Sequence, residues 1–339
     1  ARAVHGASPP AAGGHANAGR CTPPNVAVVA GAGGLPQRAS ASSELDGVFL
    51  SSVETSDDLL RLSAEESRLA RSPAMGAPLV VVFGSINMDL HAETDGFPSV
   101  GSNMKGRFFN SPGGKGANEA VGIAQLGIRT MLIGRVGVDP MGDLLLAQLP
   151  QWRVDVSAVQ RDEHHSTGVA VIVQSAREKH KLTISCQGAN SAVGQPELDA
   201  LKLALPRACA LVLQLEVNHA AVAHAAELAA EAGKMVVLKA SPCAVAGDAP
   251  DRLLRSVDLL FANDLEASVL VNASAPLLTL ADTARAAEEL RMSGIGTVVI
   301  TTAVAHVIAS SGALGAATAA AAAAAVVAPD GRTARPAGD

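Results

Sequence analysis

From residue 79 onward, short apolar runs rich in β-branched residues alternate with stretches that have helical periodicity. The apolar runs lie at 79–83, 131–136, 211–215, 235–238, 259–261 and 298–301. The helical stretches lie at 115–126, 141–149, 219–232, 263–271 and 280–292. Strands that are apolar throughout and are separated by helices are typical of a parallel sheet with both faces covered. We therefore predict an α/β fold, a three-layer α/β/α sandwich with a mainly parallel central sheet.

Two pairs of segments break this alternation, because no helix separates their members. They are 90–94 with 104–109, and 168–173 with 181–185. We interpret each pair as an antiparallel hairpin. Together they predict a small β lid beside the main sheet, with its strands within 90–109 and 168–185.

The first 77 residues differ in composition from the rest. Residues 1–43 contain no Asp or Glu, whereas Arg2, Arg20 and Arg38 interrupt a stretch rich in Ala, Ser, Gly and Pro. This composition resembles an organelle transit sequence, and the alternative is a disordered extension. We expect residues 44–77 to be a linker with one exposed helix, and residues 78–339 to form the domain. A transit sequence would place the protein in a plastid or mitochondrion; otherwise we expect it in the cytoplasm.

One run inside this extension imitates a nucleotide-binding motif. NVAVVAGAGG at 25–34 reads as a strand that leads into a dinucleotide-binding loop. The motif fails, because Pro36 stands where its third glycine would be needed. We therefore assign no site to this run.

The composition excludes several classes of partner. The formal net charge is −6, and the chain has six Phe, one Trp and no Tyr. Nucleic-acid surfaces need basic patches and stacking aromatics, so we expect no nucleic-acid partner. No window reaches the ~18 uninterrupted apolar residues of a membrane helix, so we expect no membrane partner. The four Cys lie far apart without a CxxC pair, which favours reduced thiols over a zinc site or a disulfide framework.

The segment GSINMD at 84–89 leaves the first predicted strand. In open α/β sheets, ligands bind at the carboxyl ends of the strands. Asn87 and Asp89 would carry an amide and a carboxylate to that edge, and both groups suit the hydroxyls of a polar ligand. The alternative interpretation is an Asx-rich turn that caps the strand.

A glycine-rich segment, NSPGGKGAN at 110–118, precedes an apolar helix. Glycines let the backbone approach a ligand closely, and free N–H groups at a helix start favour hydrogen-bond acceptors. The segment is not a Walker A loop. Gly116 follows Lys115 where that motif needs Ser or Thr, and Phe109 stands at its first glycine.

Taken together, these segments resemble the PfkB carbohydrate-kinase family and, within it, the ribokinases. The resemblance covers residues 79 to about 310 in register and includes STGVA at 166–170, GAN at 188–190 and QLE at 214–216. It implies a ribokinase-like sandwich whose lid covers the sugar, and a homodimer that forms through the lid. It further implies a sugar pocket lined by Asn87, Met88, Asp89, Gly114, Lys115, Gly116, Ala117, Asn118 and Glu216.

The resemblance extends to the nucleotide side through NDLE at 263–266, which is similar to the family's NxxE motif. It implies that Asn263 lies near the ATP phosphates and that Glu266 organises Mg²⁺ through water. The alternative is a helix N-cap followed by a first-turn acid. The family also allows a monovalent cation such as K⁺.

The next strand end departs from the family. Thr301 is retained as a candidate ATP contact, but Ala303 and His306 replace two expected glycines and would hinder ATP. At the end of the run 235–238, Lys239 replaces an expected Asn.

The final residues, PAGD at 336–339, resemble the family's Gly-Ala-Gly-Asp motif. The resemblance makes Asp339 the candidate general base and Gly338 a candidate ATP contact. The alternative is a chance match. We expect the family's domain to be truncated at this end, and the chain as given to show no useful kinase activity.

The expected partners are thus a small-molecule sugar and ATP. The expected reaction is ATP-dependent phosphorylation of D-ribose to ribose 5-phosphate. Two alternatives stay open: a catalytically inactive family member that is a structural subunit of an organelle complex, or a kinase for another sugar or a nucleoside.

Overall fold

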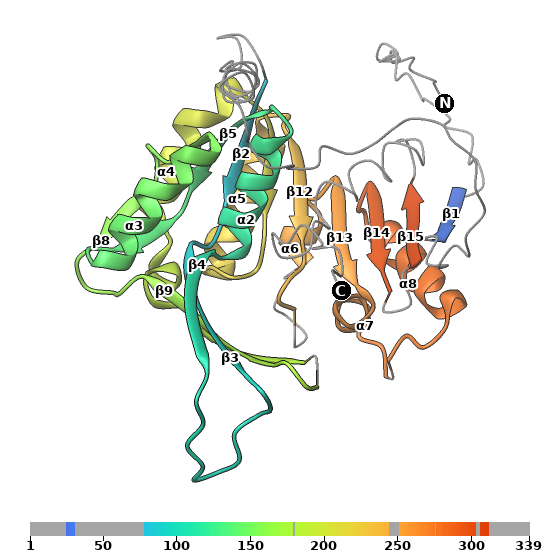
Figure 1. The fold of residues 1–339 in the computed structure, drawn as a ribbon. Helices are drawn as coiled ribbons and strands as arrows, with labels where there is room; N and C mark the ends of the chain where they lie inside the picture. The colour runs from blue at the N-terminus through green and yellow to red at the C-terminus, as the bar shows by residue number, and fades with distance from the viewer. Residues whose placement is uncertain are drawn as a thin grey trace, which may run out of the picture.

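The computed structural model describes residues 25–30, 78–178, 180–243, 251–274, 276–302 and 306–311. Its centre is a nine-stranded sheet in the order β1-β15-β14-β13-β12-β11-β2-β5-β7 (Figure 1). The strands from β14 to β7 are mutually parallel, and β15 and β1 are antiparallel at one edge. The bounds are β2 Leu79–Phe83, β5 Arg129–Ile133, β7 Val154–Asp155, β11 Ala208–Leu213, β12 Met235–Lys239, β13 Leu259–Asn263, β14 Thr297–Thr301, β15 His306–Ser311 and β1 Asn25–Ala30.

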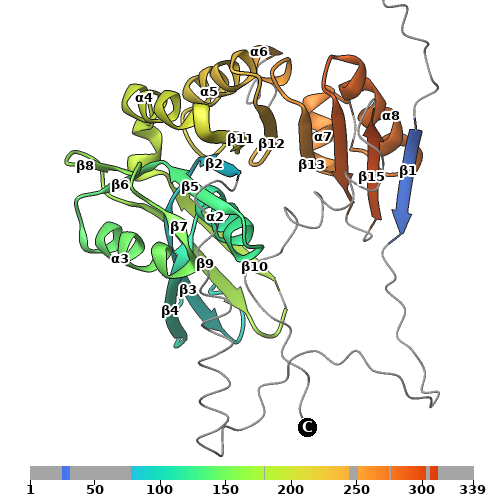
Figure 2. The same cartoon turned by 90° about the horizontal axis from the view of Figure 1, so that it is seen from above.

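Helices cover both faces of this sheet (Figure 2). One face carries α2 (Lys115–Gln125) and α3 (Pro140–Gln148). The other carries α4 (Gln195–Ala204), α5 (His219–Glu231), α6 (Asp251–Leu254), α7 (Asp264–Leu270) and α8 (Leu280–Met292). The predicted three-layer α/β/α sandwich with a mainly parallel sheet is therefore confirmed.

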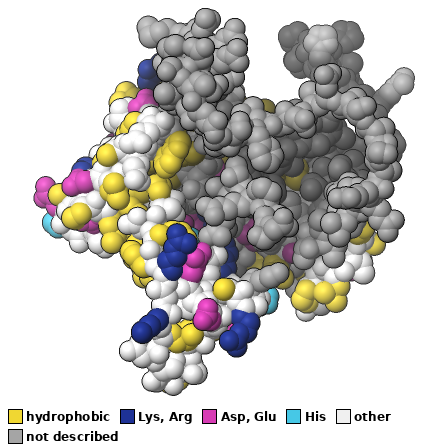
Figure 3. All heavy atoms as spheres, viewed as in Figure 1, with side chains coloured by type: hydrophobic (Ala, Val, Ile, Leu, Met, Phe, Trp, Pro, Cys, Tyr) yellow, Lys and Arg dark blue, Asp and Glu magenta, His cyan; other side chains and the backbone are white. Residues whose placement is uncertain are grey.

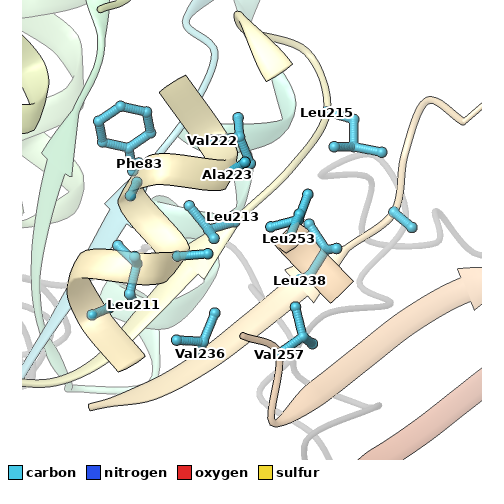
Figure 4. Packing of buried hydrophobic residues seen from close by; sticks show 14 of the residues in the cluster. Phe83, Leu211, Leu213, Leu215, Val222, Ala223, Val236, Leu238, Leu253 and Val257 are labelled. Atoms are coloured by element: carbon cyan, nitrogen blue, oxygen red, sulfur yellow. The ribbon is translucent and has the colours of Figure 1, made fainter. Parts of the chain in front are cut away.

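The two layers are filled by alternate residues of the same strands. Phe83 and Leu213 are fully buried on the side of α5, where they pack with Val222 (Figure 4). Val82 and Val212 face the opposite layer and pack with residues of α2 and α3. A strand buried on both faces has no polar positions, which is why these runs are apolar throughout.

Several helices begin at side chains that cap their first turn. Asn218 Oδ1 accepts from the backbone N–H groups of Ala220 and Ala221 at the start of α5. Asp139 Oδ1 accepts from Gly142 N at 2.8 Å at the start of α3. Such caps satisfy N–H groups that have no partner inside the helix. They fix where the chain turns from strand edge to helix.

The predicted lid is a four-stranded sheet in the order β10-β9-β3-β4. Its strands are β3 (Asn87–Thr94), β4 (Arg107–Gly113), β9 (Gly168–Ser175) and β10 (Lys181–Cys186). Strands β3 and β4 form one antiparallel pair, and β9 and β10 form the other, as expected. The parallel pairing of β3 with β9 joins the two hairpins into one sheet. Figure 1 shows this sheet extending away from the main one.

Two smaller elements connect the lid to the sandwich. A two-stranded ribbon pairs β6 (Arg135–Gly137) with β8 (Gln160–Asp162). The short 3₁₀ helix η2 (Gly188–Ala192) follows β10. Further 3₁₀ turns are η1 (Leu149–Trp152) and η3 (Leu205–Arg207).

Within the described ranges, no helix is both long and apolar enough to cross a membrane.

Strand β1 was not predicted from the sequence. It lies inside residues 1–43, where we expected an unfolded extension, and it pairs antiparallel with all six residues of β15. The run that failed as a nucleotide motif thus has a strand's conformation, and its partner is at the other end of the chain. The exposed helix expected within residues 44–77 lies outside the described residues.

Candidate functional site

The first element of the site is a lysine–carboxylate pair at the start of α2. Lys115 Nζ donates to Glu216 Oε1 at 2.7 Å, and Lys115 N donates to Glu216 Oε2 at 2.8 Å. Ser85 Oγ donates to the same Oε2 at 2.6 Å. Glu216 follows β11 and Ser85 follows β2, which are neighbouring parallel strands. The carboxyl ends of two strands and the first turn of a helix therefore meet at one point.

These contacts fix the charge of Glu216. Burial alone raises the pKa of this carboxyl, but the Lys115 ammonium and the hydrogen bonds from Lys115 and Ser85 outweigh burial. The net result is a pKa below the usual value. Glu216 is thus a carboxylate at neutral pH, held in one orientation by three donors.

Gly114 is the residue that lets α2 begin so close to β2. Its φ is +89°, and a Cβ there would lie 2.8 Å from both Asn87 N and Ser85 O. The Cβ of any other residue at this position would clash with these backbone atoms, and its φ would be unfavourable. Gly116 also lies close to the end of β2, because a Cβ built there would lie 2.7 Å from Ser85 N.

Asn87 is the first residue of β3 and is held by Asn190 of η2. Asn190 Nδ2 donates to Asn87 Oδ1 at 2.7 Å, while Asn190 Oδ1 accepts from Ile86 N at 2.9 Å. Both side chains are buried. Asn190 uses one lone pair of the Asn87 oxygen, so Asn87 can offer a ligand its Nδ2 donors and the second lone pair of Oδ1.

Asp89 lies two residues further along β3, on the same face of the strand as Asn87. It pairs in register with Ser111 of β4. A Cβ built at Gly113 would lie 2.1 Å from the Asp89 Cγ and Oδ1 atoms. The carboxylate of Asp89 therefore lies directly against a bare glycine. Gly168 has the same relation to Asn87, whose Oδ1 would be 2.3 Å from its Cβ.

The other residues that were predicted to line the sugar pocket differ in where their side chains lie. The side chain of Met88 is 1% exposed and packs in the hydrophobic cluster with Val82 and Ile86, because adjacent strand residues point to opposite faces. Ala117 packs in the same cluster. Asn118 is exposed on α2. The structure thus gathers Asn87, Asp89, Gly114, Lys115, Gly116 and Glu216, and turns the Met88 and Ala117 side chains toward the core.

On the nucleotide side, Asn263 and Glu266 form a capping box at the start of α7. Asn263 Oδ1 accepts from Glu266 N at 2.7 Å, and Glu266 Oε2 accepts from Asn263 N at 2.9 Å. This is the arrangement that the N-cap alternative describes. Asn263 is also the register partner of Thr301, so the ends of β13 and β14 bring the two residues side by side.

Several predicted nucleotide-side residues cannot be placed. Gly338, Asp339 and Ala303 lie outside the described residues, and His306 is described only as the first backbone position of β15. Among the side chains that are described, no three His, Cys, Asp or Glu residues gather where they could share a metal ion.

Sequence reasoning gave no role to Ser85 and Asn190, although both belong to the motifs that carried the resemblance. It also gave no role to Gln214, although Gln214 belongs to the QLE motif, and it passed over Glu119, which follows Asn118 directly. Gln214 Nε2 donates to Glu119 Oε2, and Oε1 of each side chain is buried without a hydrogen-bond partner in the described structure. The signal that could have found Glu119 is an acidic residue in the first turns of an otherwise apolar helix.

The profile described as pfkB family carbohydrate kinase matches residues 77–330, about three quarters of the chain. The chain belongs to this family. It is an ATP-dependent carbohydrate kinase.

Individual relatives agree with that assignment. The ribokinase of Schizosaccharomyces pombe is 31% identical to this kinase over 230 residues, which are 66% of this chain and 71% of the relative. A deoxyribokinase of Salmonella typhi is 29% identical over 231 residues, with 66% and 71% covered. The structure of Arabidopsis thaliana ribokinase complexed with ribose and ATP is similar with a TM-score of 0.59 at 27% identity, and covers 67% of this chain and 72% of its own.

Proposed function

We propose that this kinase phosphorylates D-ribose at its 5-hydroxyl and yields ribose 5-phosphate. The observation that carries this proposal is the row of Asn87 and Asp89 on one face of β3, each lying against a glycine. One carboxylate can accept from two neighbouring hydroxyls, and one amide can donate to a third oxygen. Relatives named for ribokinase activity, in yeast and in Arabidopsis, support the same sugar.

Glu216 and Lys115 would complete the recognition of the sugar. Glu216 Oε2 already accepts two hydrogen bonds, whereas Oε1 accepts one from Lys115. Oε1 therefore has a further lone pair for a sugar hydroxyl, and the ammonium has further N–H donors. A sugar that lacks the matching hydroxyl would leave these groups unpaired, which is how such a site discriminates between sugars.

The residues that end β13 and β14 suit the phosphates of ATP. Asn263 and Thr301 are side by side there, and Thr301 is half-buried with a hydroxyl donor. ATP, when bound, supplies the phosphoryl group. We place Mg²⁺ near Glu266 through water, since the cap uses only one oxygen of this carboxylate. We also propose K⁺ as a cofactor and Gly338 as an ATP contact. Asp339 is the proposed base that takes the proton of the sugar hydroxyl.

Calorimetry with the full chain tests the sugar. We expect D-ribose to bind with a higher affinity than 2-deoxy-D-ribose, D-fructose or adenosine. Asp89→Asn should weaken ribose binding by about tenfold or more, because a hydrogen bond to a charged group contributes about 1.5–3 kcal/mol. Equal ribose affinity of wild type and Asp89→Asn would refute the site. Preference for 2-deoxy-D-ribose would instead move the substrate toward that of the deoxyribokinase relatives.

We further propose a homodimer through the lid. Phe108, Leu182 and Ile184 are 67%, 57% and 64% exposed on the face of the lid opposite to Asp89. Figure 3 shows hydrophobic side chains among charged ones on this lower part of the molecule. Sedimentation should give a dimer for wild type and a monomer for Ile184→Glu. A monomeric wild type would contradict the proposal.

A further inference from the structure

Glu119 and Gln214 form a second link between α2 and the segment that follows β11. Glu119 lies one helical turn after Lys115 on α2, and Gln214 lies two residues before Glu216. Lys115 and Glu216 are the ion pair described above. Gln214 Nε2 donates to Glu119 Oε2, so the amide and the carboxyl face each other across the same two segments. The position of Glu216 against the start of α2 therefore depends on both pairs.

Each side chain of this second pair has one oxygen without a hydrogen-bond donor. In the part of the chain that the structure describes, Oε1 of Glu119 and Oε1 of Gln214 are buried and neither accepts a hydrogen bond. Gln214 is fully buried, and a Cβ built at Gly84 would overlap its Oε1, so this oxygen lies against bare backbone. Buried acceptors are nearly always paired. The pair therefore lacks one donor, which an ionised carboxylate cannot supply.

We propose that Glu119 holds a proton that it shares with Gln214, and that this neutral pair keeps Glu216 in position for the sugar. A protonated carboxyl has an O–H group, which would donate to the amide oxygen while the amide N–H keeps its bond to the acid. Both orphaned oxygens would then take part in one hydrogen bond. Glu119 is a positioning residue, because it acts on the sugar through Glu216. The inference rests on the proposed function, since it assumes that the sugar binds at Glu216.

The charges around Glu119 agree with a neutral acid at pH 7. Burial raises its pKa to about 8, and the charge of Glu216 adds to that rise. Lys239 on β12, the hydrogen bond from Gln214 and Lys115 on α2 all lower the pKa, but they do not outweigh burial. Ionisation would place a second carboxylate beside Glu216, and the two would compete for the Lys115 ammonium. Glu216 would be held less firmly, so sugar affinity should fall as the pH rises through 8.

Calorimetric titration of the full chain with D-ribose at pH 6.5 and pH 9 tests this role. If only the protonated pair holds Glu216 correctly, about one tenth of the wild type is competent at pH 9, and its apparent affinity falls about tenfold. Glu119→Met leaves Gln214 without a partner and should weaken ribose binding at both pH values. Glu119→Gln restores two hydrogen bonds with a neutral amide, so it should recover the affinity and lose most of the pH dependence.

The matched control is Glu231→Gln, the same change at an exposed acid at the end of α5. It should keep the pH dependence of the wild type. The infrared difference spectrum between wild type and Glu119→Gln reads the proton without a ligand. The carbonyl band of a protonated carboxylic acid should be present in this difference at pH 6.5 and almost lost at pH 9.

The outcomes separate this inference from the proposed function. The same pH dependence of ribose affinity in wild type and Glu119→Gln overturns the role of Glu119, while ribose binding itself still supports the proposed sugar. Absence of the acid band at pH 6.5 overturns the shared proton. A wild type that binds no ribose overturns the proposed sugar, and the acid band still decides whether the pair holds a proton. Thermal melts of Glu119→Gln and Glu231→Gln within a few degrees of wild type show that any loss is local.

Discussion

Gly113→Ala is the change that tests the geometry of the sugar site most directly. The new Cβ would lie 2.1 Å from Cγ and Oδ1 of Asp89 and 2.3 Å from Oδ2. Real atoms cannot approach so closely, so the carboxylate has to rotate away. Because the clash is with the end of a side chain rather than with backbone, the strands β3 and β4 can stay paired.

The size of the effect follows from what Asp89 would do. If its carboxylate accepts from two sugar hydroxyls, each hydrogen bond to a charged group contributes about 1.5–3 kcal/mol. Loss of both would weaken ribose binding by about 10²- to 10⁴-fold, at about 1.4 kcal/mol for each factor of ten. The free energy of unfolding should change by less than about 1 kcal/mol, as for a substitution that creates no cavity and buries no charge.

Calorimetric titration with D-ribose measures this loss. Gly194→Ala is the control, because a Cβ there meets nothing closer than 3.7 Å, at Ala192 O. The double variant Gly113→Ala/Asp89→Asn completes a mutant cycle. If both changes act through the same carboxylate, the double variant binds no more weakly than the weaker single one. Ribose affinity of Gly113→Ala within twofold of wild type, or fully additive losses, would refute the placement of Asp89 in the site.

Three further changes test other parts of the structure. Gly168→Ala would press on the Asn87 and Asn190 amides at 2.3 and 2.2 Å and on the backbone oxygen of Gln187 at 2.9 Å, and should weaken ribose binding; unchanged affinity in a titration argues against Asn87 as a ligand. Arg135→Met would leave Glu197, which is fully buried, without its two hydrogen bonds from the guanidinium, and should lower the free energy of unfolding in urea by about 3–5 kcal/mol. Glu119→Gln should remove a pH dependence. The folded-state pKa of Glu119, about 8, lies above its usual 4.5, so its contribution to stability is complete below about pH 4.5 and is lost as the pH rises through 8. Urea titrations at pH 5 and 8 should therefore show wild type losing stability relative to Glu119→Gln, and equal pH slopes would contradict the burial of this acid.

The fold was predictable because its main signal is local. Strands β2 and β11 are runs of five and six apolar residues, and a helix such as α5 keeps its own periodicity. The lid was predictable for the same reason, as two hairpins. Its assembly into one sheet was not, because the pairing of β3 with β9 joins residues about 80 positions apart and no local pattern encodes it.

Strand β1 shows the limit of reading composition. The run at 25–30 has strand propensity, yet it lies in a segment without acidic residues and rich in Ala, Ser, Gly and Pro. We judged the segment as a whole and expected no packed structure there. Its partner, β15, is more than 270 residues away, so no local pattern could have indicated the pairing.

For the candidate site, the sequence predicts members but not the contacts between them. Lys115 and Glu216 are 101 residues apart, and Ile86 and Asn190 are 104 apart. The family resemblance predicted that the first two share a pocket. It could not predict that Ser85 and Lys115 fill both lone pairs of one Glu216 oxygen, or that Asn190 occupies the oxygen of Asn87. Those contacts decide which atoms remain for a ligand, and they depend on the packing of η2 and α2 against the strand ends.

These supporting groups would hold the proposed sugar site more firmly than a surface site. Two of the groups proposed to face the ligand are each fixed by a neighbour: Glu216 by Lys115 and Ser85, and Asn87 by Asn190. A group that is already oriented loses little entropy when the sugar binds. Phosphoryl transfer depends on holding the attacking hydroxyl in line with the phosphorus, and a misplacement of about 1 Å can reduce the rate by about 10²-fold. Substitutions at Ser85 or Asn190, which need not touch the sugar, should therefore disturb the position of a bound sugar and weaken ribose binding, which a calorimetric titration would measure.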